Sequence, residues 1–297
     1  MQWIDALILG ILQGLTEFLP ISSSGHLVLG EKFLDLNVAM LKSFDVMVHM
    51  GTLMAIFVYF RKDLKGMLDV FWKALRGKFN KDDKYAKLIF YIIIGTLPAV
   101  FVGLFLEDWI DNTFRNVQAV SLLMACVGVI FVLGEFVYTK VHKSATLKQK
   151  FQEGVDEVLD ATLPEGYESV EIRGLNWKKA LVIGLAQAVA ILPGVSRSGS
   201  TIVAGLFQGI KREHCARFSF LLAIPAILGA GILTAVKNGG ELSKNVDALP
   251  LLIGFISSFA VGLLAISFLM KFLKKHSLRV FAVYLILVGL SVYFLNI

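Results

Sequence analysis

Charged residues are what this sequence has least of for its size. Only 18% of its 297 residues are charged and 56% are hydrophobic, whereas about 25% of a soluble domain is charged. So little polar surface excludes most water-soluble folds, and the apolar content excludes a disordered or collagen-like chain. The apolar residues also come in blocks of about 17 to 22 residues, the length at which a helix crosses the hydrocarbon of a bilayer. The sequence therefore predicts a polytopic membrane protein.

Cysteine is scarce as well. The two cysteines, Cys126 and Cys215, cannot build a disulfide framework and are interpreted as small hydrophobic residues. No Lys or Arg precedes Lys32, so the N-terminal apolar segment lacks the basic start of a signal peptide. The net charge of +6 comes from basic residues between the apolar blocks, where they set membrane topology, so nucleic acid is not expected as a partner.

Six apolar blocks are predicted to span the membrane as helices. They are Phe44–Phe60, Leu88–Leu106, Val117–Tyr138, Phe218–Val236, Leu249–Met270 and Val280–Leu295. Basic residues concentrate on alternate connections between these blocks, most strongly at 61–87. Since positive connections face the cytoplasm, both termini are expected outside.

Two further apolar segments, at 3–36 and 180–207, are interrupted by Pro, Gly and hydroxyl residues at 20–25 and 193–201. Broken backbone at membrane depth is tolerated only where it is buried in protein or lines a cavity. Both segments are therefore interpreted as re-entrant helical hairpins, with two kinked spanning segments as the alternative.

The two broken segments also resemble each other. A shift of 174 residues pairs Gly10 with Gly184, Gln13 with Gln187, Ser22 with Ser196, Ser24 with Ser198, Gly25 with Gly199 and Phe44 with Phe218. Each copy would contain one hairpin and three spans, and an odd number of spans inverts the second copy. We expect an all-α fold with one membrane domain over 1–297. Its halves are 1–138 and 180–297, separated by a cytoplasmic insert at 139–179.

The first break carries an acid, hydroxyls and an imidazole. Gln13 and Glu17 lie four residues apart and share a helix face. An acid in an apolar segment is a functional candidate, although a neutral or purely structural carboxyl is the alternative. Ser22, Ser23 and Ser24 follow, and then His26, which is either catalytic or a hydrogen-bonded packing residue.

The second break carries a permanent cation, Arg197. It is surrounded by Ser196, Ser198, Gly199 and Thr201 at a predicted helix start, where hydroxyls and free amides favour an anion. If the two breaks meet, they form a buried oxyanion site, unless Arg197 and Glu17 form only a structural ion pair. His49, four residues after Asp45, either lines the same cavity or packs.

The residues at the two breaks resemble the motifs of a known family. The run from Gln13 through Glu17 to His26, and the run Pro193–Thr201 (P-G-V-S-R-S-G-S-T), are similar to the two signature motifs of the undecaprenyl-diphosphate phosphatases associated with bacitracin resistance. The resemblance implies hydrolysis of undecaprenyl diphosphate to undecaprenyl phosphate and inorganic phosphate, recycling the carrier lipid for peptidoglycan synthesis. It also implies a multi-pass protein of the bacterial plasma membrane, dependent on magnesium or calcium, with its site open to the extracytoplasmic side.

By motif position, the resemblance gives Glu17, His26 and Arg197 the essential roles, and we add Ser23 to the catalytic candidates. The candidate substrate-binding residues are Gln13, Ser22, Ser24, Ser196, Ser198, Gly199 and Thr201. Glu17 would hold the cation or act as a base. The nucleophile is left open between Ser23 activated by His26, which we favour, His26 itself, and water. The lipid tail stays in the bilayer, and a homodimer is considered.

A different class of function fits part of the pattern. Inverted repeats with broken helices at the middle of the membrane are typical of transporters, so the alternative is a transporter or flippase for an anionic lipid or another anion.

Overall fold

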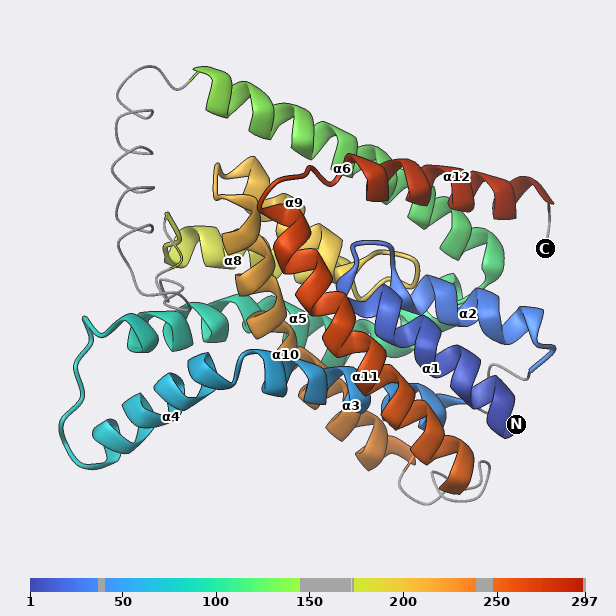
Figure 1. Cartoon of the computed structure of the whole chain (residues 1–297), viewed down its shortest axis with the longest axis horizontal. Helices are drawn as coiled ribbons and strands as arrows, with labels where there is room; N and C mark the ends of the chain where they lie inside the picture. The colour runs from blue at the N-terminus through green and yellow to red at the C-terminus, as the bar shows by residue number, and fades with distance from the viewer. Residues whose placement is uncertain (37–40, 145–171, 173, 239–247, 296–297) are drawn as a thin grey trace.

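A computed structural model describes residues 1–36, 41–144, 172, 174–238 and 248–295, and every regular element in them is an α-helix. Figure 1 shows the arrangement. The helices are α1 (Trp3–Phe18), α2 (Ser23–Phe33), α3 (Lys42–Tyr59), α4 (Arg61–Leu75), α5 (Lys84–Phe114), α6 (Val117–Ser144), α8 (Trp177–Val189), α9 (Arg197–Phe207), α10 (Arg212–Asn238), α11 (Ala248–Leu273) and α12 (Arg279–Leu295).

The all-α membrane fold expected from composition is confirmed. Helices α5, α6, α10 and α11 are long and apolar enough to cross a bilayer, and they cover four of the six predicted spans. The other two spans differ from the expectation. Helix α3 meets α4 at a bend of 79°, so the pair counts at most as one further span, and α12 is a shorter apolar helix. The bend falls at Phe60, where the apolar block of α3 gives way to the basic residues Arg61 and Lys62.

Helix α4 occupies much of the connection that the sequence marked only as basic. Its inward face is fixed by Asp63, whose carboxylate accepts a 2.6 Å hydrogen bond from Arg217 of α10, and both side chains are buried. Removing one partner of such a pair would leave an uncompensated buried charge. The ion pair therefore ties α4 to the membrane helices.

Both predicted helix breaks are present. Helix α1 ends at Phe18, just before Pro20, and α2 begins after Ser22, whose hydroxyl accepts the amide of Gly25 as an N-cap. Helix α8 ends at Val189, and α9 begins after Ser196, which caps the amide of Gly199 in the same way. Whether each pair of arms is re-entrant in the bilayer stays a prediction.

The first arm of each broken segment packs on a helix from the opposite half of the chain. Helix α1 lies against α11, where a Cβ on Gly10 would approach the Ser257 hydroxyl, and α8 lies against α5, where Gly184 meets the backbone of Gly95. Small residues allow such close helix packing in membranes. An inverted repeat would produce this arrangement, in which the first arm of each half packs on a helix of the other half. The inversion itself stays a prediction.

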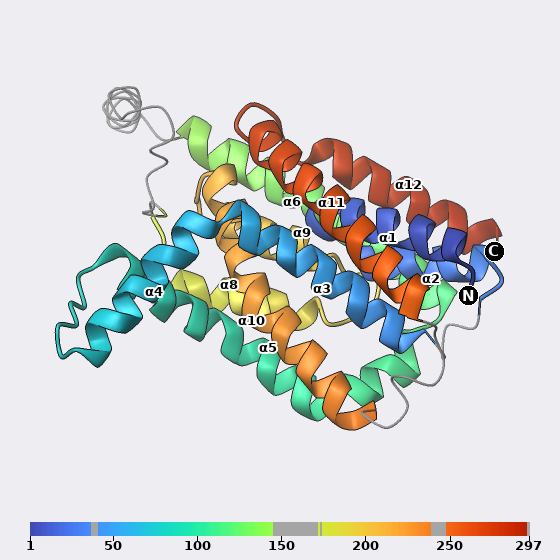
Figure 2. The same cartoon turned by 60° about the horizontal axis from the view of Figure 1, so that its bottom comes forward.

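The predicted insert at 139–179 falls largely on residues 145–171 and 173, which lie outside the described part of the chain. The first half extends slightly further than expected, because α6 continues to Ser144. The two chain ends lie at one end of the molecule, and α4 with its following turn lies at the other (Figures 1 and 2).

Candidate active site

The two helix breaks meet in space, which is the condition on which the candidate oxyanion site depended in the sequence analysis. The amide of Gly194 donates a 3.3 Å hydrogen bond to the Ser24 hydroxyl, and the Ser198 hydroxyl donates to the carbonyl of Leu19, also at 3.3 Å. Between these contacts the guanidinium of Arg197 forms an ion pair with Glu17. Residues about 180 positions apart in the chain therefore share one site.

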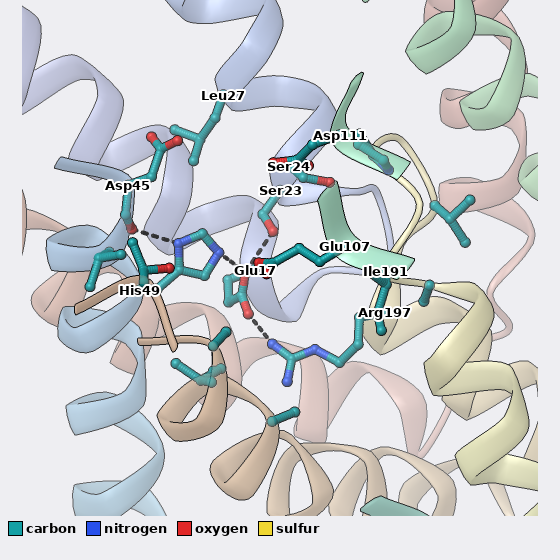
Figure 3. A pocket seen from close by; sticks show the side chains of 18 of the residues that line it. Glu17, Ser23, Ser24, Leu27, Asp45, His49, Glu107, Asp111, Ile191 and Arg197 are labelled. Carbon is teal, nitrogen blue, oxygen red and sulfur yellow. Dashed lines mark hydrogen bonds and ion pairs between the residues drawn. The ribbon is translucent and has the colours of Figure 1, made fainter. Parts of the chain in front are cut away.

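Glu17 is the centre of this site, and 5% of the residue is exposed. Its Oε1 pairs with Arg197, while its Oε2 accepts hydrogen bonds from Gln13 Nε2 at 2.9 Å and from Ser23 Oγ at 2.5 Å. Nε2 of His49 lies 3.7 Å from the same Oε2. Figure 3 shows Glu17 enclosed by Ser23, His49 and Arg197. Such a set of donors favours the charged form of the Glu17 carboxylate. The hydroxyl proton of Ser23 points at this carboxylate, which can therefore accept it.

A cavity of about 420 Å³ opens beside Glu17. Of the predicted site residues, Glu17, Ser23, Ser24, Ser196, Arg197 and Ser198 line it. Ser22 and Ser196 also use their hydroxyls to cap α2 and α9. Thr201 donates to the carbonyl of Arg197 at 2.8 Å and lies 2.6 Å from the Ser219 hydroxyl, away from the cavity lining.

Two other predicted binding residues sit behind the lining. Gln13 is fully buried, and its Nε2 contacts the site through Glu17. Gly199 gives its amide to Ser196, and a Cβ there would collide with the ring of Phe131. These residues shape the two breaks without lining the cavity.

The structure places His26 away from the cavity. Its Nδ1 lies 2.8 Å from the Ser22 carbonyl, and its Nε2 lies 2.7 Å from the hydroxyl of Tyr284. The Ser23 hydroxyl donates to Glu17 and not to His26. The histidine that lines the cavity is His49, held by a 2.6 Å contact between its Nδ1 and the carbonyl of Asp45. A partnership of Ser23 with His26 is therefore not what the geometry offers.

One end of the cavity is acidic. Asp45, Glu107, Asp108 and Asp111 line it together with Arg115, whose guanidinium donates to Asp45 at 2.8 Å. Sequence reasoning missed this end of the site. Asp45 was noted only as a neighbour of His49. The other signal was the group of acids Glu107, Asp108 and Asp111 after the second predicted span, and a connection between spans shows nothing about what it faces. Tyr284 was missed because it sits within a continuous apolar block.

The other wall of the cavity is apolar. Helix α10 contributes Ala226, Ile227, Ala230 and Gly231, and α3 contributes Val46 and Met50. The site thus combines a cation, a helix N-terminus and hydroxyls with a carboxylate that can take a proton, next to a wall of mainly apolar side chains. This arrangement can bind a phosphorylated headgroup and assist attack on phosphorus.

Comparisons with known proteins agree with this chemistry. The family model described as bacitracin resistance protein BacA matches residues 6–291. The chain is 38% identical to an undecaprenyl-diphosphatase of Rubrobacter xylanophilus, covering 96% of this chain and 94% of that protein. It is 36% identical to one of Methanobrevibacter smithii, covering 99% and 97%, and 40% identical to one of Corynebacterium efficiens, covering 98% and 90%.

Proposed function

Because the chain belongs to the BacA family of bacitracin resistance proteins, we propose that it hydrolyses undecaprenyl diphosphate to undecaprenyl phosphate and inorganic phosphate. This reaction returns the carrier lipid to cell-wall synthesis. The observation that carries the proposal is the contact between Arg197 and Glu17 inside a cavity with one apolar wall. The comparisons give no support to a transporter of an anionic lipid.

The residues at the site have different roles in the reaction. Arg197 and the N-terminus of α9, with the hydroxyls of Ser196 and Ser198, bind the diphosphate and stabilise the charge that spreads over the transferred phosphoryl group. Glu17 takes the proton of the attacking group, which is either the Ser23 hydroxyl at 2.5 Å or a water in its place. The bond from the attacking oxygen to the terminal phosphorus forms as the bond from that phosphorus to the leaving undecaprenyl phosphate breaks. Attack by water releases inorganic phosphate directly, whereas attack by Ser23 leaves a phosphoserine that a water then hydrolyses to serine and inorganic phosphate.

The first prediction concerns Arg197. Arg197→Ala should lower kcat/KM for undecaprenyl diphosphate by about 10³-fold, because it removes the cation at the transferred phosphate. Arg197→Lys should keep part of the activity, since it retains the charge but loses the planar fork of donors. Phosphate release by the purified protein in detergent measures both variants.

Arg61→Ala is the matched control, because Arg61 is exposed and bonds only to the nearby carbonyl of Val58. Its activity should equal that of the wild type within about twofold. Undiminished hydrolysis by Arg197→Ala would contradict the assigned role, and a wild-type protein that releases no phosphate would overturn the function itself.

The family resemblance also implies a divalent cation. Among the described residues, no group of three or more His, Cys, Asp or Glu side chains could hold a metal. However, the buried Oε1 of Gln13 has no hydrogen-bond partner, and it lies on the residue whose Nε2 bonds to Glu17. An amide oxygen and one carboxylate suit Mg²⁺ or Ca²⁺ when substrate phosphates complete the coordination. Gln13 and Glu17 would hold the ion, which when bound supplies charge neutralisation at the diphosphate.

The second prediction follows from this donor pair. A chelator should abolish phosphate release, and added Mg²⁺ or Ca²⁺ should restore it. Gln13→Leu should need roughly tenfold more cation for half-maximal activity, because it removes an oxygen ligand while keeping the volume. Cation titrations of both proteins measure the shift. Hydrolysis that persists in chelator would contradict the cation requirement.

The apolar wall of the cavity fits the start of the prenyl tail. Ala230 lines the cavity and is exposed at the same time, so the cavity is open along the membrane-spanning helix α10. Space at this wall is tight at Gly231, where a Cβ would come within 2.9 Å of the Met50 methyl group. We place the first isoprene units along this face of α10.

The third prediction uses two glycines of α10. Gly231→Leu should lower kcat/KM for undecaprenyl diphosphate roughly tenfold by crowding the wall. A short-tailed isoprenoid diphosphate should be affected less. Gly229→Leu is the matched control, since a Cβ there meets nothing within 4 Å. Equal losses of kcat/KM in the two variants, or equal losses for both substrates, would contradict the placement of the prenyl tail along this wall.

The orientation follows from the charges at the two ends of the molecule. The basic residues of α4 and the turn after it lie at the end opposite the chain termini (Figure 1), and positive segments remain cytoplasmic. The acidic end of the cavity, at Asp111 and Arg115 near the end of α5, would then face the extracytoplasmic side of the plasma membrane.

The fourth prediction tests this orientation. In a Cys126→Ala background, a membrane-impermeant thiol reagent added to intact cells should label Asn112→Cys, whereas Lys81→Cys should react only after the cells are permeabilised. Both positions are exposed in the structure. Labelling of Lys81→Cys alone in intact cells would invert the topology.

A further inference from the structure

Tyr284 connects the last helix to the first helix break. Its hydroxyl lies 2.7 Å from Nε2 of His26, and the two rings stack with centroids 5.6 Å apart and an interplanar angle of 10°. The residues are 258 positions apart, with His26 on α2 and Tyr284 on α12. Neither ring lines the cavity, yet His26 lies only three residues after Ser23.

The partners of His26 fix its protonation state. Nδ1 faces the carbonyl of Ser22, which can only accept a hydrogen bond, so Nδ1 carries the proton. In the neutral ring Nε2 is then an acceptor, and the Tyr284 hydroxyl donates to it. Both ring nitrogens are therefore occupied, and neither is free to take the proton of Ser23.

The carbonyl that His26 holds belongs to the peptide bond between Ser22 and Ser23. Because a peptide unit is planar, the orientation of this carbonyl fixes the start of the Ser23 backbone. The same oxygen also accepts the backbone amide of His26 at 3.1 Å. Ser22 has φ 71°, in the left-handed region that disfavours a residue with a side chain, so this turn persists only where its surroundings hold it.

We propose that Tyr284 and His26 form a positioning relay for the active site. The Tyr284 hydroxyl fixes the His26 ring, Nδ1 of His26 fixes the Ser22–Ser23 peptide, and this peptide directs the Ser23 hydroxyl to Glu17 at 2.5 Å. His26 is thus a positioning residue that transfers no proton. The catalytic part of this inference rests on the proposed phosphatase function.

The relay is tested by substitutions that retain or remove one contact at a time. Tyr284→Phe should lower kcat by about tenfold with little change in KM, because Nε2 of His26 loses its donor. In His26→Asn the side-chain amide can still donate to the Ser22 carbonyl, so this variant should lose about as much as Tyr284→Phe. His26→Leu removes that donor and should lose at least about 100-fold.

The double variant separates a relay from two independent effects. If the tyrosine acts only through the histidine, His26→Asn combined with Tyr284→Phe should be no slower than His26→Asn alone. Tyr293→Phe is the matched control on α12, since the ring of Tyr293 contacts Phe294 and its hydroxyl makes no hydrogen bond to the residues that the structure describes. Its kcat should equal that of the wild type.

Three outcomes would overturn the relay. If His26→Asn is as inactive as His26→Leu, the imidazole does chemistry that an amide cannot replace. Additive losses in the double variant would show that Tyr284 acts elsewhere, and full activity of Tyr284→Phe would show that its hydrogen bond positions nothing.

A second measurement does not depend on turnover. In protein labelled with ¹⁵N-histidine, His26 should show a protonated Nδ1 and an unprotonated Nε2, and the Nε2 resonance should shift in Tyr284→Phe but not in Tyr293→Phe. The opposite tautomer would contradict the relay even if the wild-type protein hydrolysed no diphosphate. Conversely, the expected tautomer in an inactive protein would count against the proposed function only.

Discussion

The ion pair between Glu17 and Arg197 is the contact on which the site depends. It joins two breaks that lie in different halves of the sequence, and neither break has a charged partner of its own in the lining. A charge held in an apolar segment is costly, so each residue accounts for the presence of the other. The neighbouring contacts of Ser24 with Gly194, and of Ser198 with Leu19, keep the breaks in register around this pair.

Much of the architecture could be predicted because its signals are local. Block length gives the spans, and Pro20, Gly194 and the serines give the breaks. The place of α4 was not predictable, because the buried pair of Asp63 and Arg217 that ties it to α10 joins residues separated by 154 positions in the chain. The length of an apolar block cannot show that Asp63 is buried or that Arg217 is its partner.

In the candidate site too, local features were predictable from the sequence and the directions of side chains were not. The sequence named Glu17, Ser23 and Arg197 as candidates that would share one site if the two breaks met, because a buried acid and a buried cation each need a partner. Of the two histidines, it gave the catalytic role to His26 and left His49 either to line the cavity or to pack. His26 is nearer to Ser23 in the chain, but the helical geometry of α2 turns its ring toward α12, while His49 reaches the cavity from α3. Direction from a helix axis, and not distance along the chain, determines which imidazole meets the carboxylate.

The packing of α1 on a helix of the other half of the chain has a consequence for biosynthesis. Helix α1, which carries Glu17, is made before the surface that it packs against, because α11 begins only at Ala248. A ribosome must therefore translate most of the polypeptide before the acid reaches its final environment. Until α11 is made, α1 lacks the surface against which its glycines pack, so the site of this enzyme is completed only by one of the last helices of the chain.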